Sequence, residues 1–170
     1  MITRKQEKEA ILAQHARDEQ GQALVEYALI LFLVALVLPL LMVLLLAVLD
    51  FGRAFNYWID QTHLANEGAR WAAVNKNPGG GTLQQYLRGQ GTTPELRNGG
   101  TASVPSPLQI CISFPSGTSR VGDPVRVTAT STFNWVPFLG SRIGIAQTTM
   151  TASSTMRLEA VPTAYGAGCS

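Results

Sequence analysis

The feature that most constrains this chain is an apolar run from Ala28 to Leu49, in which only Pro39 is neither aliphatic nor aromatic. As an α-helix the run would be about 33 Å long, and the hydrocarbon core of a bilayer is about 30 Å thick. A buried core helix of this length would need apolar cover on every side, which the polar remainder of the chain cannot supply. The run therefore predicts one transmembrane helix over residues 28–49, bent but not broken at Pro39.

The flanks of the run predict its orientation. Arg53 is the only cation in the first eighteen residues after it, whereas four cations precede it: Arg4, Lys5, Lys8 and Arg17. This bias places the amino end in the cytoplasm and the carboxyl-terminal part on the far side of the membrane. A cleaved signal peptide would have a shorter apolar stretch that ends in small residues, so cleavage after Leu49 is not expected.

Composition excludes other classes of protein. The 170 residues carry a formal charge of only +2, and 14% of them are charged. No stripe of Lys and Arg appears, so a nucleic-acid partner is not expected. Two cysteines are too few for a disulfide-rich miniprotein or for a multi-cysteine zinc site.

The junction at Gly21 carries the most informative residues. Glu26 is a carboxylate at the amphipathic start of the apolar region, where it is costly unless it has a partner. Cleavage between Gly21 and Gln22 would create an amine one helical turn before Glu26, a spacing at which opposite charges meet. The same carboxylate could instead pair with the amine of a neighbouring subunit. A third interpretation is that Gly21 is a flexible entry to the helix and that Glu26 sits favourably near its positive end.

A Gly followed by four residues and then Glu26-Tyr27, just ahead of a transmembrane run, resembles the prepilin-peptidase site of type IVb pilins and pseudopilins. The resemblance implies that Gly21 is the cleavage-site glycine, Gln22 the first mature residue, and Glu26 and Tyr27 the residues that follow in the motif. It also implies cleavage on the cytoplasmic side by a membrane aspartyl protease. The leader here is long and has balanced charge, which departs from the family pattern.

The chain also resembles TadE-like proteins, which are minor pilin-like components of tight-adherence pilus systems. Four segments carry the resemblance, namely residues 50–55, 63–73, 122–127 and 156–159. It implies a non-enzymatic minor pilin in the bacterial inner membrane, with its carboxyl-terminal domain in the periplasm or in a surface pilus. The implied partners are a prepilin peptidase, other minor pilins, the major pilin and the inner-membrane assembly platform; no cofactor is implied. A type II secretion pseudopilin is an alternative. The two are distinguished by which system's genes lie near the gene of this protein.

Beyond the membrane the pattern predicts an α+β, pilin-like fold, in which a long helix packs on a small antiparallel sheet of three to four strands. The expected segments are a leader over 1–21, the long helix over 22–76 and an outer domain over 77–170. One stripe of the helix is expected to pack on that domain: Phe51, Phe55, Trp58, Thr62, Ala65, Ala69 and Ala72. Residues 82–88 read as a short helix, the chain from there to Pro107 as an exposed loop, and strands are expected over 108–114, 125–133 and 146–159.

Cys111 and Cys169 would lie on the oxidising side of the membrane, where they can form one disulfide. That bond would tie down the carboxyl end of the chain. The alternative is a buried thiol at one position and a free one at the other.

No catalytic residue is predicted. Asp60, His63 and Glu67 share a helix face and could in principle bind a metal, but a solvated face is the favoured interpretation. No nucleophile elbow, phosphate loop or Cys/His metal spacing occurs. The rival function is a membrane-tethered periplasmic binding or catalytic domain, with its site in the loop from Gly79 to Pro107.

Overall fold

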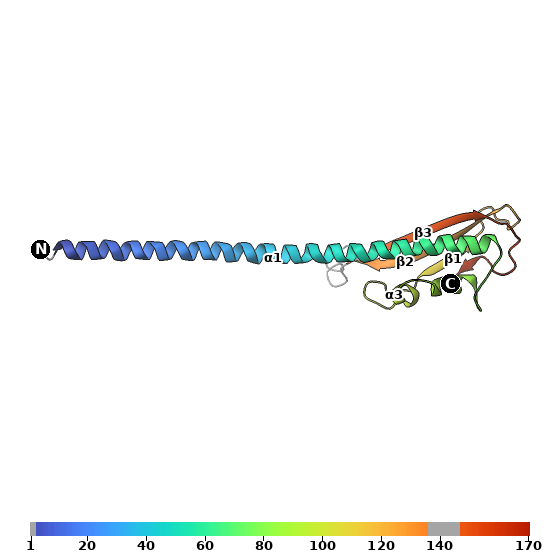
Figure 1. Ribbon diagram of the computed structural model, residues 1–170, viewed down its shortest axis with the longest axis horizontal. Coiled ribbons are helices and arrows are strands. Elements are labelled where there is room, and N and C mark those ends of the chain that lie inside the picture. The colour runs from blue at the N-terminus through green and yellow to red at the C-terminus, as the bar shows by residue number, and fades with distance from the viewer. Residues whose placement is uncertain (1–2, 136–146) are drawn as a thin grey trace. The chain divides into compact units, whose positions relative to one another are not determined.

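The computed structural model describes residues 3–135 and 147–170, with side chains from residue 24 onward, and the chain forms two compact units, residues 1–46 and 47–170. The fold class is α+β, as predicted. Helix α1 (Thr3–Ala73) is followed by the short helices α2 (Leu83–Gly89) and α3 (Pro94–Asn98) (Figure 1). The strands are β1 (Gln109–Ser113), β2 (Pro124–Asn134), β3 (Gln147–Arg157) and β4 (Gly168–Cys169).

The first unit is helical from Thr3 onward. The sequence suggested a helix from Gln22, but α1 begins nineteen residues earlier and contains Gly21. Residues 3–20 contain no Gly or Pro and are rich in Ala, Gln, Glu and Lys, which favour helix. A single glycine costs a helix only about 1 kcal/mol, so Gly21 need not interrupt it. Pro39 does not interrupt it either, as expected.

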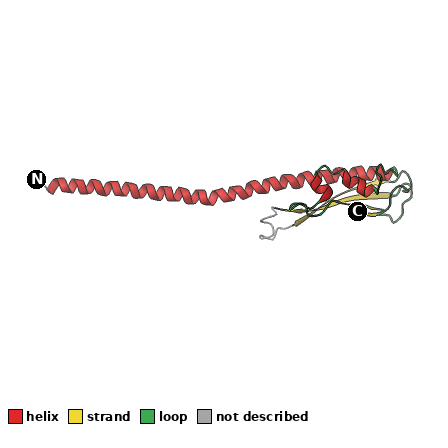
Figure 2. Ribbon diagram, turned by 90° about the horizontal axis from the view of Figure 1, so that it is seen from below, coloured by secondary structure: helices red, strands yellow, loops and turns green. Residues whose placement is uncertain are grey.

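The second unit packs the outer part of α1 on one four-stranded antiparallel sheet. The strand order is β3-β2-β1-β4, and Figure 2 shows the strands running beside the helix. Strands β2 and β3 pair along their full lengths, from Pro124 opposite Arg157 to Asn134 opposite Gln147. The three strands expected from alternation are thus present, although position 146, the predicted start of the third, lies outside the described residues. The short edge strand β4 was not predicted.

Alternation in β1 and β2 builds the sheet side of the core. Ile110 and Ile112 of β1 point inward, and so do four apolar residues of β2: Val125, Val127, Ala129 and Phe133. From α1 the core receives small or medium side chains, such as Leu64, Ala65 and Ala69. Small residues on the helix let it approach the sheet closely, so the sheet and the helix share one core.

Two predictions for this unit are wrong. The stretch before Pro107 is not simply an exposed loop, because it forms α3 and buries Leu96 and Val104 completely. The predicted stripe on α1 packs only in its later part. Phe51, Phe55 and Trp58 are exposed, and Ala54 and Tyr57 occupy the inward face instead. Spacing cannot tell which of two adjacent apolar faces meets the sheet.

Candidate functional site

The predicted processing and assembly residues all lie on α1. Gly21 and Gln22 are within the helix, and the side chain of Gln22 lies outside the described part of the structure. Glu26 and Tyr27 are exposed, and within the described side chains no hydrogen bond or ion pair engages the Glu26 carboxylate. A lone carboxylate among apolar residues is available to an amine from elsewhere.

The apolar part of α1 is exposed throughout. From Leu24 onward it contains the one described helix that is long and apolar enough to cross a membrane, with a mean hydropathy of 3.3 in its most apolar window and none of that window buried. Soluble proteins rarely expose contiguous apolar surface of more than a few hundred Å². This surface needs lipid or other apolar helices around it.

A second exposed apolar surface lies on α1 within the outer unit, and we call it the aromatic stripe: Phe51, Phe55 and Trp58. The ring centroids of Phe51 and Phe55 are 6.5 Å apart, and those of Phe55 and Trp58 are 6.0 Å apart, in stacked arrangements. The exposed fractions are 64%, 52% and 46%. The three rings therefore form one continuous surface that the domain's own core does not use.

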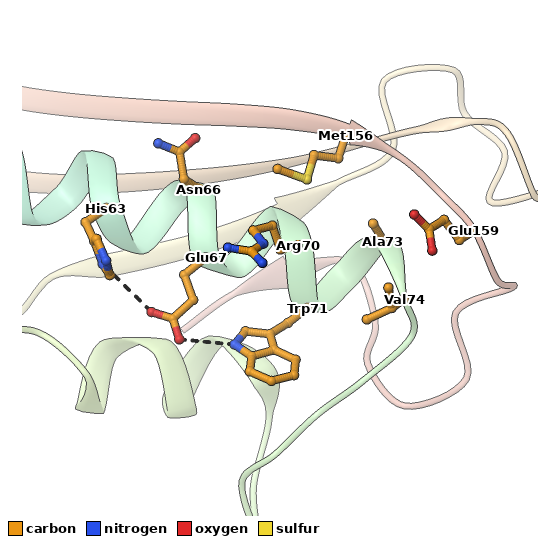
Figure 3. A pocket seen from close by; sticks show the side chains of 9 residues that line it. All are labelled: His63, Asn66, Glu67, Arg70, Trp71, Ala73, Val74, Met156 and Glu159. Carbon is orange, nitrogen blue, oxygen red and sulfur yellow. Dashed lines mark hydrogen bonds and ion pairs between the residues drawn. The ribbon is translucent and has the colours of Figure 1, made fainter.

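A cavity of about 830 Å³ lies in the outer unit beside the end of α1. Figure 3 shows the side chains that line it, most of them from the last turns of α1. Met156 and Glu159 reach it from β3 and the chain just after it. Its wall combines apolar side chains, such as Trp71 and Val74, with polar or charged side chains, namely His63, Glu67, Arg70 and Glu159.

Three side chains of α1 that line this cavity are linked by polar contacts (Figure 3). The indole Nε1 of Trp71 donates to Oε1 of Glu67 at 3.2 Å, and Oε2 of the same carboxylate lies 3.8 Å from Nδ1 of His63. Lys76 places its ammonium 5.4 Å from the centre of the Trp71 ring. No cluster of three His, Cys, Asp or Glu side chains suited to a metal occurs among the described residues. The wall of the cavity thus combines apolar and polar side chains, as the walls of ligand-binding sites do.

Asp60 does not join His63 and Glu67 on a solvated face. It is 8% exposed, and both of its carboxylate oxygens accept hydrogen bonds from Thr92, one from the backbone N–H and one from the hydroxyl, each at 2.8 Å. Asp50 is buried to the same degree. Sequence spacing placed Asp60 on a solvated face, because its partner Thr92 comes from a segment that was predicted to be an exposed loop.

The two cysteines are joined as expected: the Cys111–Cys169 disulfide links β1 to β4, and the two residues are also partners in the strand register. No free cysteine is found in the described residues. Arg88 extends this anchor, since its guanidinium donates to the hydroxyl of Ser170 at 2.9 Å. The carboxyl-terminal segment is thereby held against the sheet.

The architecture is that of an α+β protein whose amino-terminal helix carries a large exposed apolar surface. Residues 34–70 match the family model described as TadE-like protein, which shows the similarity to that family over about a fifth of the chain. The matched segment contains most of the apolar run and all of the aromatic stripe. No curated protein and no solved structure matches the chain.

Proposed function

We propose that this protein is a minor pilin-like subunit of a tight-adherence pilus, held in the bacterial inner membrane by α1. Its amino end is cytoplasmic and its outer unit is periplasmic until assembly. The observation that carries the proposal is the exposed apolar helix, which coincides with the TadE-like match over residues 34–70. A helix of this kind can anchor a subunit in lipid and later pack against other subunits in a polymer.

The first step of the proposal is cleavage after Gly21 by a prepilin peptidase. Hydrolysis of the Gly21–Gln22 peptide bond consumes one water and releases residues 1–21 with a new carboxylate. Gln22 then carries a protonated amine. Glu26 lies four residues further along α1, so this amine or that of a neighbouring subunit can neutralise it. Tyr27 lies beside Glu26 and is exposed for packing.

The second step is packing of α1 against helices of other pilins. The aromatic stripe supports this step because it extends the exposed apolar surface past the predicted membrane run. At about 1.5 Å per residue, Trp58 lies about 14 Å beyond Leu49 along the helix axis. That exceeds the roughly 5–7 Å of headgroup region on each side of the hydrocarbon core. Lipid alone would therefore not cover the whole stripe in an upright helix, whereas a neighbouring helix could.

The rival function is a membrane-tethered binding domain, and the cavities of the outer unit are the observation in its support. Proteolytic processing distinguishes the two functions. With the peptidase present, intact-mass spectrometry should find a mature chain lacking residues 1–21, and Gly21→Trp should leave the full-length chain. The matched control Gly52→Trp, at an open position of α1, should be processed normally. A mature wild-type chain that retains Met1 would overturn the proposal.

Assembly is tested at Glu26. Glu26→Gln removes the charge with little change of shape, so this variant should be cleaved but should not support pili. Glu7→Gln, in the segment that is removed, should support both. Normal piliation by Glu26→Gln would contradict the proposed pairing and favour the rival function.

A further inference from the structure

A second cavity lies between the ends of the two short helices and brings two arginines together. It has a volume of about 520 Å³ and is lined by Gln85, Arg88, Gly89, Arg97 and Asn98. Arg88 stands in the last turn of α2 and Arg97 in the last turn of α3. We call this cavity the arginine pocket. Its size falls in the range of small-ligand sites, about 300–1,000 Å³.

The positive charge in the arginine pocket is not neutralised by the chain. Within the described residues no carboxylate forms an ion pair with Arg88 or Arg97. Among the described residues Arg88 donates to the Ser170 hydroxyl, and the Nε atom of Arg97 is buried without a hydrogen-bond partner there. Two arginine side chains that line one cavity, neither of them paired with a carboxylate among the described residues, leave a site suited to an oxygen anion.

Nearby acids are already engaged elsewhere. Asp60 accepts both of its hydrogen bonds from Thr92, and Glu95 accepts the hydroxyl hydrogen of Tyr57. Neither carboxylate is among the residues that line the arginine pocket. Among the described residues these carboxylates form no ion pair with Arg88 or Arg97, so a ligand would not have to displace them.

The backbone around the arginine pocket is fixed before any ligand arrives. Thr82 caps α2 with a reciprocal capping box to Gln85, and Thr93 caps α3. Between the helices Gly91 is buried, and a Cβ there would lie 3.2 Å from both the Arg88 carbonyl oxygen and Cγ of Arg97. This glycine permits the close approach that places both arginines beside one cavity. Preorganised donors bind with less loss of entropy.

We infer that the arginine pocket binds a small oxyanion, either a phosphate or a carboxylate group of a soluble ligand. Guanidinium groups match such oxygens in geometry and charge, and they form stronger hydrogen bonds than neutral donors. The amides of Gln85 and Asn98 supply further polar groups at the rim. This inference goes beyond the proposed function, because it requires neither cleavage at Gly21 nor assembly.

The test is titration calorimetry on the purified full-length chain in detergent, with inorganic phosphate and, separately, citrate, and with chloride holding the ionic strength constant. Saturable binding of either probe supports the inference, and which probe binds identifies the anion class. Arg97→Gln and Arg88→Gln should each weaken binding at least about tenfold, the loss of one charge-assisted hydrogen bond. Arg97→Lys keeps the charge and guards against a folding defect, and it should weaken binding less than Arg97→Gln.

The matched control is Arg126→Gln. Arg126 is an exposed arginine of β2 that does not line the arginine pocket, and its Nε donates to the Thr155 hydroxyl at 3.3 Å. This variant removes the same charge and should bind the probes as the wild type does. The inference is overturned if neither probe binds saturably. Equal weakening by Arg126→Gln and Arg97→Gln would also overturn it, because binding would then reflect net charge alone.

Discussion

The side-chain amide of Asn75 forms two hydrogen bonds with Thr163. Its Nδ2 donates to the Thr163 hydroxyl at 2.8 Å, and its Oδ1 accepts from the Thr163 backbone N–H at 2.8 Å. The same oxygen also accepts the N–H of Ala164 at 2.9 Å. Asn75 has a positive φ of 51° just after the end of α1, a conformation that Gly and Asn tolerate best. One residue therefore ends the long helix and fixes the returning carboxyl-terminal segment.

Replacement of Asn75 separates these two roles. Asn75→Gly keeps the backbone conformation but loses the side-chain hydrogen bonds, so it should lower the free energy of unfolding by about 1 kcal/mol. Asn75→Ala loses the same bonds and also places a Cβ in a left-handed conformation, which adds about 1 kcal/mol. Urea unfolding in detergent measures both. Equal losses would show that the backbone conformation does not contribute.

Tyr165 gives the outer unit a pH-dependent contact. Its hydroxyl donates to the carbonyl oxygen of Ala72 at 2.9 Å, and burial raises the pKa of this hydroxyl from 10.0 to about 12. Between these values the folded state keeps a proton that the unfolded state loses, so the free energy of unfolding should fall as the pH rises from about 10 to about 12.

The measurement compares wild type with Tyr165→Phe by urea unfolding across that pH range. Below about pH 10 the variant should be less stable by about 1 kcal/mol, because it lacks one hydrogen bond. The difference should shrink as the pH rises, while the remaining tyrosines affect both proteins equally. A constant difference would rule out this linkage.

Gly68 sets the distance between α1 and its neighbours. A Cβ at this position would lie 2.6 Å from Cδ1 of Leu87 and 3.0 Å from Cγ1 of Val127, both in fully buried side chains. Gly68→Ala should therefore destabilise the protein by about 1–3 kcal/mol through overpacking. Gly52→Ala is the matched control, since nothing lies within 4 Å of that Cβ. It should stabilise the helix by about 0.5–1 kcal/mol, and thermal unfolding would reveal the opposite signs.

The Cys111–Cys169 disulfide spans 58 residues of sequence. Loop-closure entropy predicts that its loss lowers the free energy of unfolding by about 4 kcal/mol. Cys111→Ser, Cys169→Ser and the double variant should be about equally unstable, because each breaks the same link. A reductant should bring the wild type to their level and leave the variants unchanged. A wild type that is insensitive to reductant would contradict the prediction.

The paired hydrogen bonds of Asp60 join α1 to the segment between α2 and α3. Asp60→Ala should cost about 2–3 kcal/mol, because hydrogen bonds to a charged acceptor contribute more than neutral ones. Thr92→Ser keeps both donors and should be close to neutral. If Asp60→Ala unfolds at the same urea concentration as Thr92→Ser, the buried carboxylate has no stabilising role.

Much of the fold could be predicted because the sequence carries local periodicity. Alternation over residues 108–114 and 125–133 predicted β1 and β2. The long helix was predicted to end at position 76, and α1 ends three residues earlier, at Ala73. Helix α3 was missed, although Thr93-Pro94 supplies an N-cap followed by a proline in the first turn. Strand β4 was missed because two residues carry no period, and its place depends on the pairing of Cys169 with Cys111.

The candidate sites divide in the same way. The pattern from Gly21 to Tyr27 is local, so sequence can suggest it, and its role in processing stays a prediction. The arginine pocket is not local: Arg88 and Arg97 converge only when α2 and α3 fold around Gly91. The aromatic stripe shows a third limit. Periodicity identified Phe51, Phe55 and Trp58 as one apolar row but could not show that this row faces outward.

Every described residue of the hydrophobic core lies at position 54 or later in the chain. A truncated version that starts near Asp50 would thus keep this core, the disulfide and both cavities. It would lack the apolar run of α1 that is predicted to span the membrane. Such a fragment is the natural starting point for crystallisation. Its remaining tendency to self-associate would come mainly from three stacked rings on one side.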